Sequence, residues 1–214
     1  MHTIPFRHLR TALCGLSLAT SLALPAHALV LTQLPGVVAS ASSCYLNAGC
    51  SAANDWSAAK ILDGRDYDLT GRYAWSAGNH GTAGAPAWVR LDLGALYSLE
   101  SAELRFTYNN GGWNGYSNVY QLRASADASN WVVVASGTLV DSSNPAAVNN
   151  TFAWAAGSGP VARYVEYRVI GGTHWAALGD MRLEGVSAVP EAGSASLLLV
   201  GLLALSAVIA KRRG

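Results

Sequence analysis

The segment Trp88-Val-Arg-Leu-Asp-Leu93 alternates apolar and polar residues, and the same period of two returns in residues 102–108, 119–125 and 164–170. Successive side chains of a strand point to opposite faces, so this period predicts strands that bury one face and expose the other. The continuous apolar run Trp131-Val-Val-Val134 is instead typical of a strand that is buried on both faces. These segments predict a protein built from strands.

Turn-forming residues separate the expected strands. They are Asn, Asp, Ser, Gly and Pro in the segments 109–112, 127–130, 141–145, 157–160 and 171–172. A helical turn is expected only near residues 52–62, and strands do not alternate with helices, so a Rossmann-type fold is excluded. We therefore predict an all-β protein, an antiparallel β-sandwich of two sheets.

The first 28 residues have the three parts of a secretory signal peptide. Arg7 and Arg10 give a positive start, an apolar stretch follows from residue 12 to residue 24, and Ala26-His27-Ala28 has the small residues that a signal peptidase requires. About thirteen apolar residues, at about 1.5 Å each, are too short to span a bilayer core of about 30 Å. We therefore expect a signal helix that is cleaved after Ala28, and export across a membrane.

The other end of the chain carries a second apolar segment. Residues 194–210 hold no charge and would form a helix about 26 Å long, at the short limit for a transmembrane helix. The chain closes with Lys211-Arg-Arg-Gly214, and basic residues after such a helix stay cytoplasmic. A plain C-terminal anchor and a sorting signal are the two interpretations.

Three features together resemble the PEP-CTERM sorting signal, here over residues 188–214: Val189-Pro190-Glu191-Ala192-Gly193, the apolar helix and the basic tail. That signal occurs in Gram-negative bacteria that make exopolysaccharide, and its motif is processed by an exosortase, a membrane cysteine protease. The usual Pro-Glu-Pro is Pro190-Glu191-Ala192 in this chain. The resemblance implies a protein that crosses the inner membrane, is anchored transiently by its C-terminal helix, and reaches the cell surface or the extracellular matrix.

Charge limits the partners of the exported part. Residues 29–188 hold nine basic and twelve acidic residues, a net charge of −3. A mildly acidic domain has no charge attraction for nucleic acid or for anionic lipid. It can bind cations or neutral sugars.

Cys44 and Cys50 are the two cysteines of the exported part. An oxidising compartment favours a disulfide between them. A metal site is the alternative, although two cysteines without a nearby histidine make a poor one. We assign both cysteines to an N-terminal extension, residues 29–54, which precedes the sandwich at residues 55–187.

Several short segments resemble, in their order along the chain, a discoidin domain, also called the coagulation factor 5/8 C-terminal domain. They are Ala59-Lys-Ile-Leu-Asp63-Gly64, Trp75-Ser76, Trp88-Val-Arg-Leu-Asp92-Leu-Gly94, residues 120–127, Asn130-Trp131, residues 162–165 and residues 179–185. The resemblance covers residues 55–186 and implies the galactose-binding-like jelly roll. That fold agrees with the sandwich predicted from periodicity.

The resemblance implies a structural calcium site where the Asp-Gly loop meets the last strand. Calcium takes several oxygen ligands from carboxylates, carbonyls and hydroxyls. The candidate ligands are Asp63, Asp66, Asp68, Thr70 and Asp180. The alternative is that Asp63-Gly64 only forms a turn and the other acids are solvated.

The resemblance also implies a ligand site, because sugar-binding members of the family place an aromatic ring and a few polar groups on loops at one end of the sandwich. The C–H face of a sugar ring lies on an aromatic face, and its hydroxyls need fixed polar partners. The candidate residues are Trp113, Asn114 and Tyr116 on a Gly-rich loop, with Asn79, His80 and His174 from other loops.

The other tryptophans have different expected roles. Trp75, Trp88 and Trp131 lie in strand-like segments and are expected in the core. Trp175 is a further candidate for the ligand site. The alternative for Trp113 and for Trp175 is that the ring caps the edge of the core.

The exported part has few groups suited to catalysis. Its histidines are His80 and His174, and it has neither a Gly-x-Ser-x-Gly nucleophile motif nor a His-Glu-x-x-His zinc motif. A carboxylate pair acting as a glycoside hydrolase is a remote alternative. We therefore expect an exported, non-catalytic module that binds carbohydrate or exopolysaccharide. A structural or adhesive matrix protein that binds another protein is the alternative.

Overall fold

The computed structural model describes residues 28–46, 50, 56–64, 74–106, 116–140 and 149–188. The expected signal peptide, apart from its last residue, and the sorting motif with Val189, Pro190 and Glu191 lie outside these ranges, as does the expected C-terminal helix. Within the described ranges, no helix has the length and apolar character needed to cross a bilayer.

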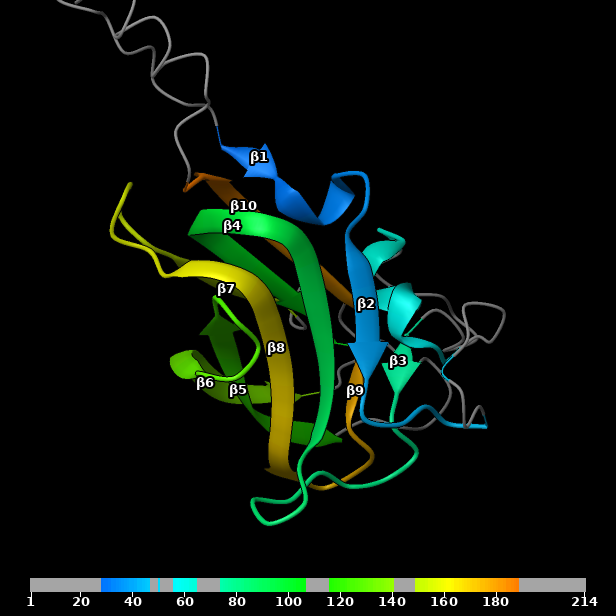
Figure 1. Ribbon diagram of the computed structural model, residues 1–214. Coiled ribbons are helices and arrows are strands. Elements are labelled where there is room, and N and C mark those ends of the chain that lie inside the picture. Colours follow the sequence, from blue (N-terminus) through cyan, green and yellow to red (C-terminus); the bar gives the residue numbers. More distant parts are fainter. Residues whose placement is uncertain are drawn as a thin grey trace, which may run out of the picture.

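One long strand organises the molecule. β4 (Ala87–Arg105) contains the segment whose alternation predicts the fold, and it continues through a bend into a second alternating segment. At the bend Gly94 has a φ of +77°, and its N–H donates a 2.8 Å hydrogen bond to the Asp92 carboxylate. Figure 1 shows β4 curving over the top of the molecule, so that its two halves run in different layers.

The first half of β4 belongs to the first sheet. Its strands follow the order β2–β4–β8–β5–β6, and all neighbours are antiparallel. The bounds of the other four strands are β2 (Val38–Ala41), β5 (Ser117–Ser125), β6 (Val132–Val140) and β8 (Val161–Gly172).

The second half of β4 belongs to the second sheet, in the order β1–β10–β4–β7, again antiparallel. Its other strands are β1 (Leu29–Val30), β7 (Asn149–Ala153) and β10 (Asp180–Ser187). A short pair, β3 (Trp75–Ser76) and β9 (Ala177–Leu178), and two 3-10 helices, Leu31–Gln33 and Ala58–Leu62, complete the described elements. The prediction of an all-β antiparallel sandwich is confirmed.

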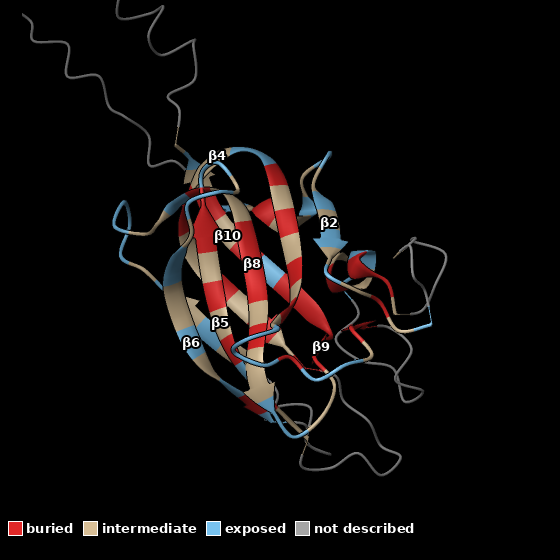
Figure 2. Ribbon diagram, turned by 60° about the horizontal axis from the view of Figure 1, so that its bottom comes forward, coloured by how far each residue is buried: buried red, intermediate tan, exposed pale blue. Residues whose placement is uncertain are grey.

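The core lies between the two sheets and is filled by alternate residues of the strands, as the period of two predicts. Figure 2 shows buried and half-buried residues alternating along β4 and β8. Trp75 is fully buried, as expected, and its indole N–H donates a 2.9 Å hydrogen bond to the Ser43 carbonyl. The largest fully buried side chains besides Trp75 include Tyr120, Tyr167, Ile61, Leu91, Leu104 and Met181.

Two sequence predictions about burial are wrong. The run that begins at Trp131 lies in an edge strand, β6, where Val132 and Val133 are 64% and 49% exposed. Trp88 and Trp131 are half-buried and lie outside the core. An apolar run alone does not show whether one or both faces of a strand are buried, because this depends on the position of the strand in the sheet.

Candidate functional site

Aromatic side chains gather at the end of the sandwich where β8 ends and where β4 and β5 begin. We call this group the aromatic cluster, and it comprises Tyr45, Trp56, His80, Tyr116, His174 and Trp175. Its members come from segments that lie far apart in the sequence. The fold therefore collects at one end several rings that the chain carries separately.

The centre of the cluster is a stack of three rings. Tyr116 and His174 have ring centroids 3.7 Å apart and nearly parallel planes. The ring of His174 lies 5.2 Å from that of Trp175, also nearly parallel, and Tyr45 lies 4.6 Å from Trp175. All four rings are half-buried, and Tyr45 extends the stack of three by a tilted contact with Trp175.

Polar groups border the stack. His80 is exposed and lies 5.8 Å from His174, edge to face. The side-chain amide of the exposed Asn79 donates to Ser43 Oγ at 3.3 Å, and the main-chain carbonyl of Asn79 accepts the Ala176 N–H at 2.8 Å. The structure thus brings together four of the predicted ligand residues, Asn79, His80, Tyr116 and His174. Trp113 and Asn114 lie outside the described residues.

The loop that carries His174 and Trp175 is held by the strands beside it. Gly172 ends β8 with a φ of +140° and lies so close to the Ser117 carbonyl that a Cβ would collide with it. The Thr173 N–H donates to that carbonyl at 3.0 Å, and the Ser117 N–H donates to Thr173 Oγ1 at 3.0 Å. Because Tyr116 precedes Ser117, these bonds also place the tyrosine against the histidine.

Asn118 is a positioning residue that the sequence analysis missed. Its buried amide donates to the Trp175 carbonyl at 3.1 Å and to the Ser117 carbonyl at 3.0 Å, and its Oδ1 accepts the Ala177 N–H at 2.9 Å. A usable signal was present: Asn118 shares the inward face of β5 with Tyr120 and Leu122, where the period of two predicts an apolar residue.

The predicted disulfide between Cys44 and Cys50 is present, with Cα atoms 5.2 Å apart. It lies beside the cluster, since the next residue, Tyr45, donates its N–H to the Ser76 carbonyl at 2.7 Å and packs on Trp175. The segment expected as an N-terminal extension also supplies β1 and β2, which are hydrogen-bonded into the two sheets.

The electrostatics of the cluster favour an uncharged histidine. Burial, and next the neighbouring His80, lower the pKa of His174 below its ordinary value of 6.5. His174 is therefore neutral at pH 7 and keeps both a donor and an acceptor nitrogen.

The expected calcium residues are described only in part. Burial raises the pKa of Asp180 to about 6; Arg105 opposes this, and the carboxylates of Asp63 and Glu103 add to it. Such a carboxylate, buried near others of the same sign, is the kind of ligand that a cation stabilises. Among the described residues, no three His, Cys, Asp or Glu side chains are grouped closely enough to hold a metal. Asp66, Asp68 and Thr70 lie outside the described ranges.

The chain belongs to the F5/8 type C domain family, whose model matches residues 38–181. This confirms the resemblance to a discoidin domain. None of the curated proteins searched matches the chain.

Solved structures share the fold at low sequence identity. The family 32 carbohydrate-binding module (CBM) of Clostridium perfringens NanJ, in complex with galactose, is 18% identical, with a TM-score of 0.53 over 74% of this chain and 99% of that one. CpGH89CBM32-5 from Clostridium perfringens, in complex with GalNAc-beta-1,3-galactose, is 19% identical, with a TM-score of 0.50 over 69% of this chain and 94% of that one.

A family 89 glycoside hydrolase from Clostridium perfringens, in complex with PUGNAc, also matches. It is 19% identical, with a TM-score of 0.51 over 76% of this chain and 16% of that one. The likeness therefore covers only a small part of the enzyme, of the size of a single β-sandwich.

Proposed function

We propose that the protein is an exported, non-catalytic module that binds carbohydrate at the cell surface or in an exopolysaccharide matrix. The observation that carries the proposal is the aromatic cluster at the loop end of the sandwich. A stacked aromatic surface with polar groups at its border suits a sugar, which offers one face of C–H groups and a rim of hydroxyls. Galactose and GalNAc-galactose bound to modules of the same fold give further support.

The residues proposed to contact the sugar are those the sequence analysis chose. Tyr116 would supply the ring, and Asn79, His80 and His174 the hydrogen bonds, with Trp113 and Asn114 completing the set from the neighbouring loop. Nε2 of His174 is buried, so a hydrogen bond from this residue to a sugar hydroxyl would have to come from Nδ1. The pre-formed stack would lower the entropic cost of ordering the site on binding.

A non-catalytic role is supported by the state of the sheet carboxylates. Arginines engage Asp92, Glu103, Glu166 and Glu184, each at 3.1 Å or less. Hydrogen bonds from Arg163 and from Arg182 lower the pKa of Asp92 and of Glu184, and a carboxyl group that stays ionised is a poor general acid.

Export and sorting rest on the two ends of the sequence. A signal peptidase would act after Ala28, and an exosortase would act near Pro190-Glu191 after transient anchoring by the C-terminal helix. The Cys44–Cys50 disulfide is consistent with an oxidising compartment.

A glycan array tests the sugar site with the full 214-residue chain in a non-ionic detergent. We expect binding to a defined sugar, loss of binding in Tyr116→Ala and Trp113→Ala, and no loss in Tyr164→Ala, which removes a ring near the other end of β8. Binding that survives Tyr116→Ala and Trp113→Ala would remove the site from the loop end. No binding to any glycan by the folded chain would argue against the function itself.

Calcium is proposed as a structural ion held by Asp180 and Asp63, with Asp66, Asp68 and Thr70. We expect calcium to raise the melting temperature of the wild-type chain and of Asp92→Asn, but not of Asp180→Asn. Both variants lose one carboxylate charge, but Asp92 binds Arg163 at the bend of β4. An equal calcium response in the wild type and in Asp180→Asn would contradict this site.

Binding of another protein is the second candidate function, and the β6 edge favours it. β6 has nine residues without a charge, pairs only with β5 in the described sheet, and exposes Val132, Val133 and Val140. An uncharged edge strand can accept a further strand, from another protein or from a second copy of this chain. Sedimentation velocity would detect self-association, and Val133→Lys should remove it if β6 is the contact.

A further inference from the structure

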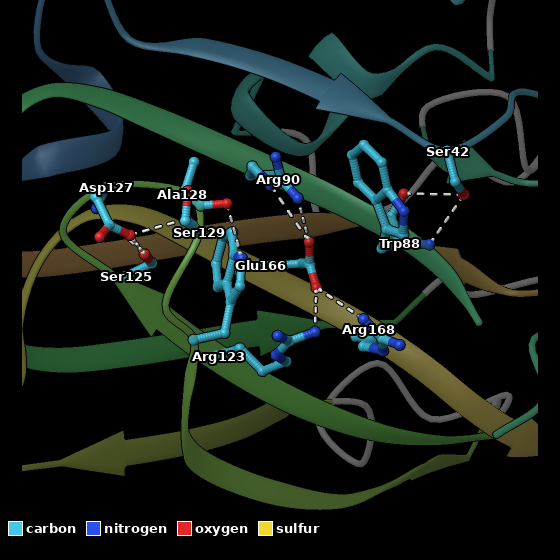
Figure 3. A network of polar contacts seen from close by, with 11 residues as sticks. Ser42, Trp88, Arg90, Arg123, Ser125, Asp127, Ala128, Ser129, Glu166 and Arg168 are labelled. Atoms are coloured by element: carbon cyan, nitrogen blue, oxygen red, sulfur yellow. Dashed lines mark hydrogen bonds and ion pairs between the residues drawn. The ribbon is translucent and has the colours of Figure 1, made fainter. Parts of the chain in front are cut away.

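The outer face of the first sheet carries three arginines around one buried carboxylate. We call this group the arginine face: Arg90 of β4, Arg123 of β5, and Arg168 and Glu166 of β8. Arg90 donates to Glu166 Oε2 at 2.8 Å through Nη2 and at 3.2 Å through Nε, and Arg123 donates to Oε1 at 3.1 Å. Figure 3 shows the three guanidinium groups converging on Glu166 from three neighbouring strands.

The charges of the arginine face do not balance. One carboxylate faces three guanidinium groups, which leaves an excess of +2 on a domain whose net charge is −3. The pKa of Arg123 is lowered, mainly by burial and further by Arg168 and Arg90, while Glu166 opposes the shift. A second anion at this face would relieve the repulsion among the arginines.

The arginines can be reached from solvent, whereas the carboxylate cannot. The side chains of Arg90, Arg123 and Arg168 are 25%, 16% and 30% exposed, and that of Glu166 is 2% exposed. Arg168 Nη1 lies 3.8 Å from Glu166 Oε1, beyond hydrogen-bond distance, and its side chain is the most exposed of the three arginines. An incoming anion would therefore meet guanidinium donors first.

Aromatic rings hold two of the three guanidinium groups, those of Arg90 and Arg123, in place. The Arg90 guanidinium lies 4.6 Å from the ring centroid of Trp131 and 4.6 Å from that of Trp88, and the Arg123 guanidinium lies 5.0 Å from Trp131. Trp131 is in turn fixed by a 3.0 Å bond from its indole N–H to the Ala128 carbonyl. Such stacking fixes the planar donors before a ligand arrives.

We propose that the arginine face is a second binding site, which takes the carboxylates of a polyuronate, an acidic polysaccharide. A planar carboxylate matches the paired donors of a guanidinium, the rings of Trp88 and Trp131 offer apolar surface beside the charges, and a sheet face accepts an extended chain. Three arginines are fewer than the basic clusters that recognise anionic membranes. This site does not depend on the sugar site at the loop end.

The test is titration calorimetry of the full chain, in chelator, with polygalacturonate and with its fully methyl-esterified form. The two polymers share a backbone and differ in charge, so we expect only polygalacturonate to bind. Its binding should weaken at about 0.5 M salt, because salt screens the attraction between the arginines and the carboxylates. Arg168→Gln should bind polygalacturonate about ten-fold more weakly than the wild type. Arg168→Lys keeps the charge without the planar donors, so its affinity should lie between those of the wild type and Arg168→Gln.

Arg182→Gln is the matched control. Arg182 is an exposed arginine of β10 on the other sheet, bound to Glu184 at 2.7 Å, and its loss removes the same charge. We expect it, and Tyr116→Ala, to bind polygalacturonate like the wild type.

Four results would overturn the proposal. They are absence of polygalacturonate binding, equal binding of the methyl ester, equal weakening by Arg168→Gln and Arg182→Gln, and Arg168-dependent binding of duplex DNA or of phosphatidylserine vesicles that exceeds binding of polygalacturonate. Melting temperatures check that every variant is folded. If Arg168→Gln does not fold, Arg168→Lys replaces it in the comparison with Arg182→Gln.

Discussion

At the scale of single residues, the amide of Asn118 connects the end of the first sheet to the loop of His174 and Trp175. It is fully buried and makes three hydrogen bonds to backbone groups of Ser117, Trp175 and Ala177. A buried backbone group that loses its partner costs more free energy than the bond itself contributes. Asn118 therefore helps to hold the aromatic cluster from within the core, beside the hydrogen bonds between Ser117 and Thr173.

Asn118→Ala is expected to lower the free energy of unfolding by about 2–3 kcal/mol, because the Ala177 N–H and the Trp175 carbonyl lose their partner in the core. Sugar binding should weaken at the same time, since the loop is no longer held. Urea denaturation and the glycan array measure the two effects. Asn130→Ala removes an exposed amide bonded to Asp127 at 2.8 Å and should cost less than about 1 kcal/mol. Equal costs for the two variants would show that Asn118 has no special role.

His174 predicts how stability depends on pH. Its folded pKa lies below the ordinary value of 6.5, so the unfolded chain takes up the proton first, and stability is lost as pH falls through that value. His174→Phe keeps a ring in the stack and should lose less stability between about pH 8 and pH 5. Asp180, whose pKa is raised to about 6, acts with the opposite sign, but it is common to both proteins. The measurement is the free energy of unfolding of both proteins by urea at several pH values. Equal losses in the wild type and in His174→Phe would contradict the prediction.

At the scale of elements, the end of β8 determines where the loop that carries His174 and Trp175 begins. Gly172 combines a positive φ with close contact to Ser117, whereas Gly157, with a φ of +75°, has open space around it. Both glycines use a conformation that other residues adopt at a cost, but only Gly172 also lacks room for a side chain.

Gly157→Ala is expected to cost about 1 kcal/mol of unfolding free energy, which is the cost of the backbone conformation alone. Gly172→Ala should cost about 3 kcal/mol, because the added Cβ also separates β8 from β5. Urea denaturation of the two variants gives the comparison. If both lose the same amount, the contact with Ser117 is not tight in solution.

At the scale of the whole molecule, β4 makes one cooperative unit of the two sheets. Leu91 lies in its first half and Leu104 in its second, and both are fully buried. The same strand is hydrogen-bonded into both layers. If one sheet unfolds, β4 leaves it, and the other sheet then loses one of its own strands, so we expect the two sheets to unfold together.

Leu91→Ala and Leu104→Ala should each lower the stability of the whole sandwich by about 2–5 kcal/mol. Circular dichroism and tryptophan fluorescence should report one transition with the same midpoint for each variant. Two separate transitions in either variant would show that the sheets unfold independently.

Much of the fold could be predicted from the sequence, and the candidate site only in part. The alternation in residues 88–93 and 102–108 predicted both halves of β4, but the single strand joining them was not predicted, because a bend at Gly94 looks like a turn in the sequence. Tyr116 and His174 were chosen on different loops for their chemistry, yet their 3.7 Å stack follows from the pairing of β5 with β8.

The sequence by itself determined the inward faces of β4, β5 and β8, because side-chain alternation is a local property of a strand. It also indicated the Cys44–Cys50 pair, because an oxidising compartment favours a disulfide between the two cysteines of the exported part. Only the tertiary structure decided that β6 lies at an edge, that Trp88 and Trp131 pack on arginines outside the core, and that three guanidinium groups surround Glu166. These features depend on which strands become neighbours. Arg90 and Glu166 are 76 positions apart, and nothing within either segment records that they meet.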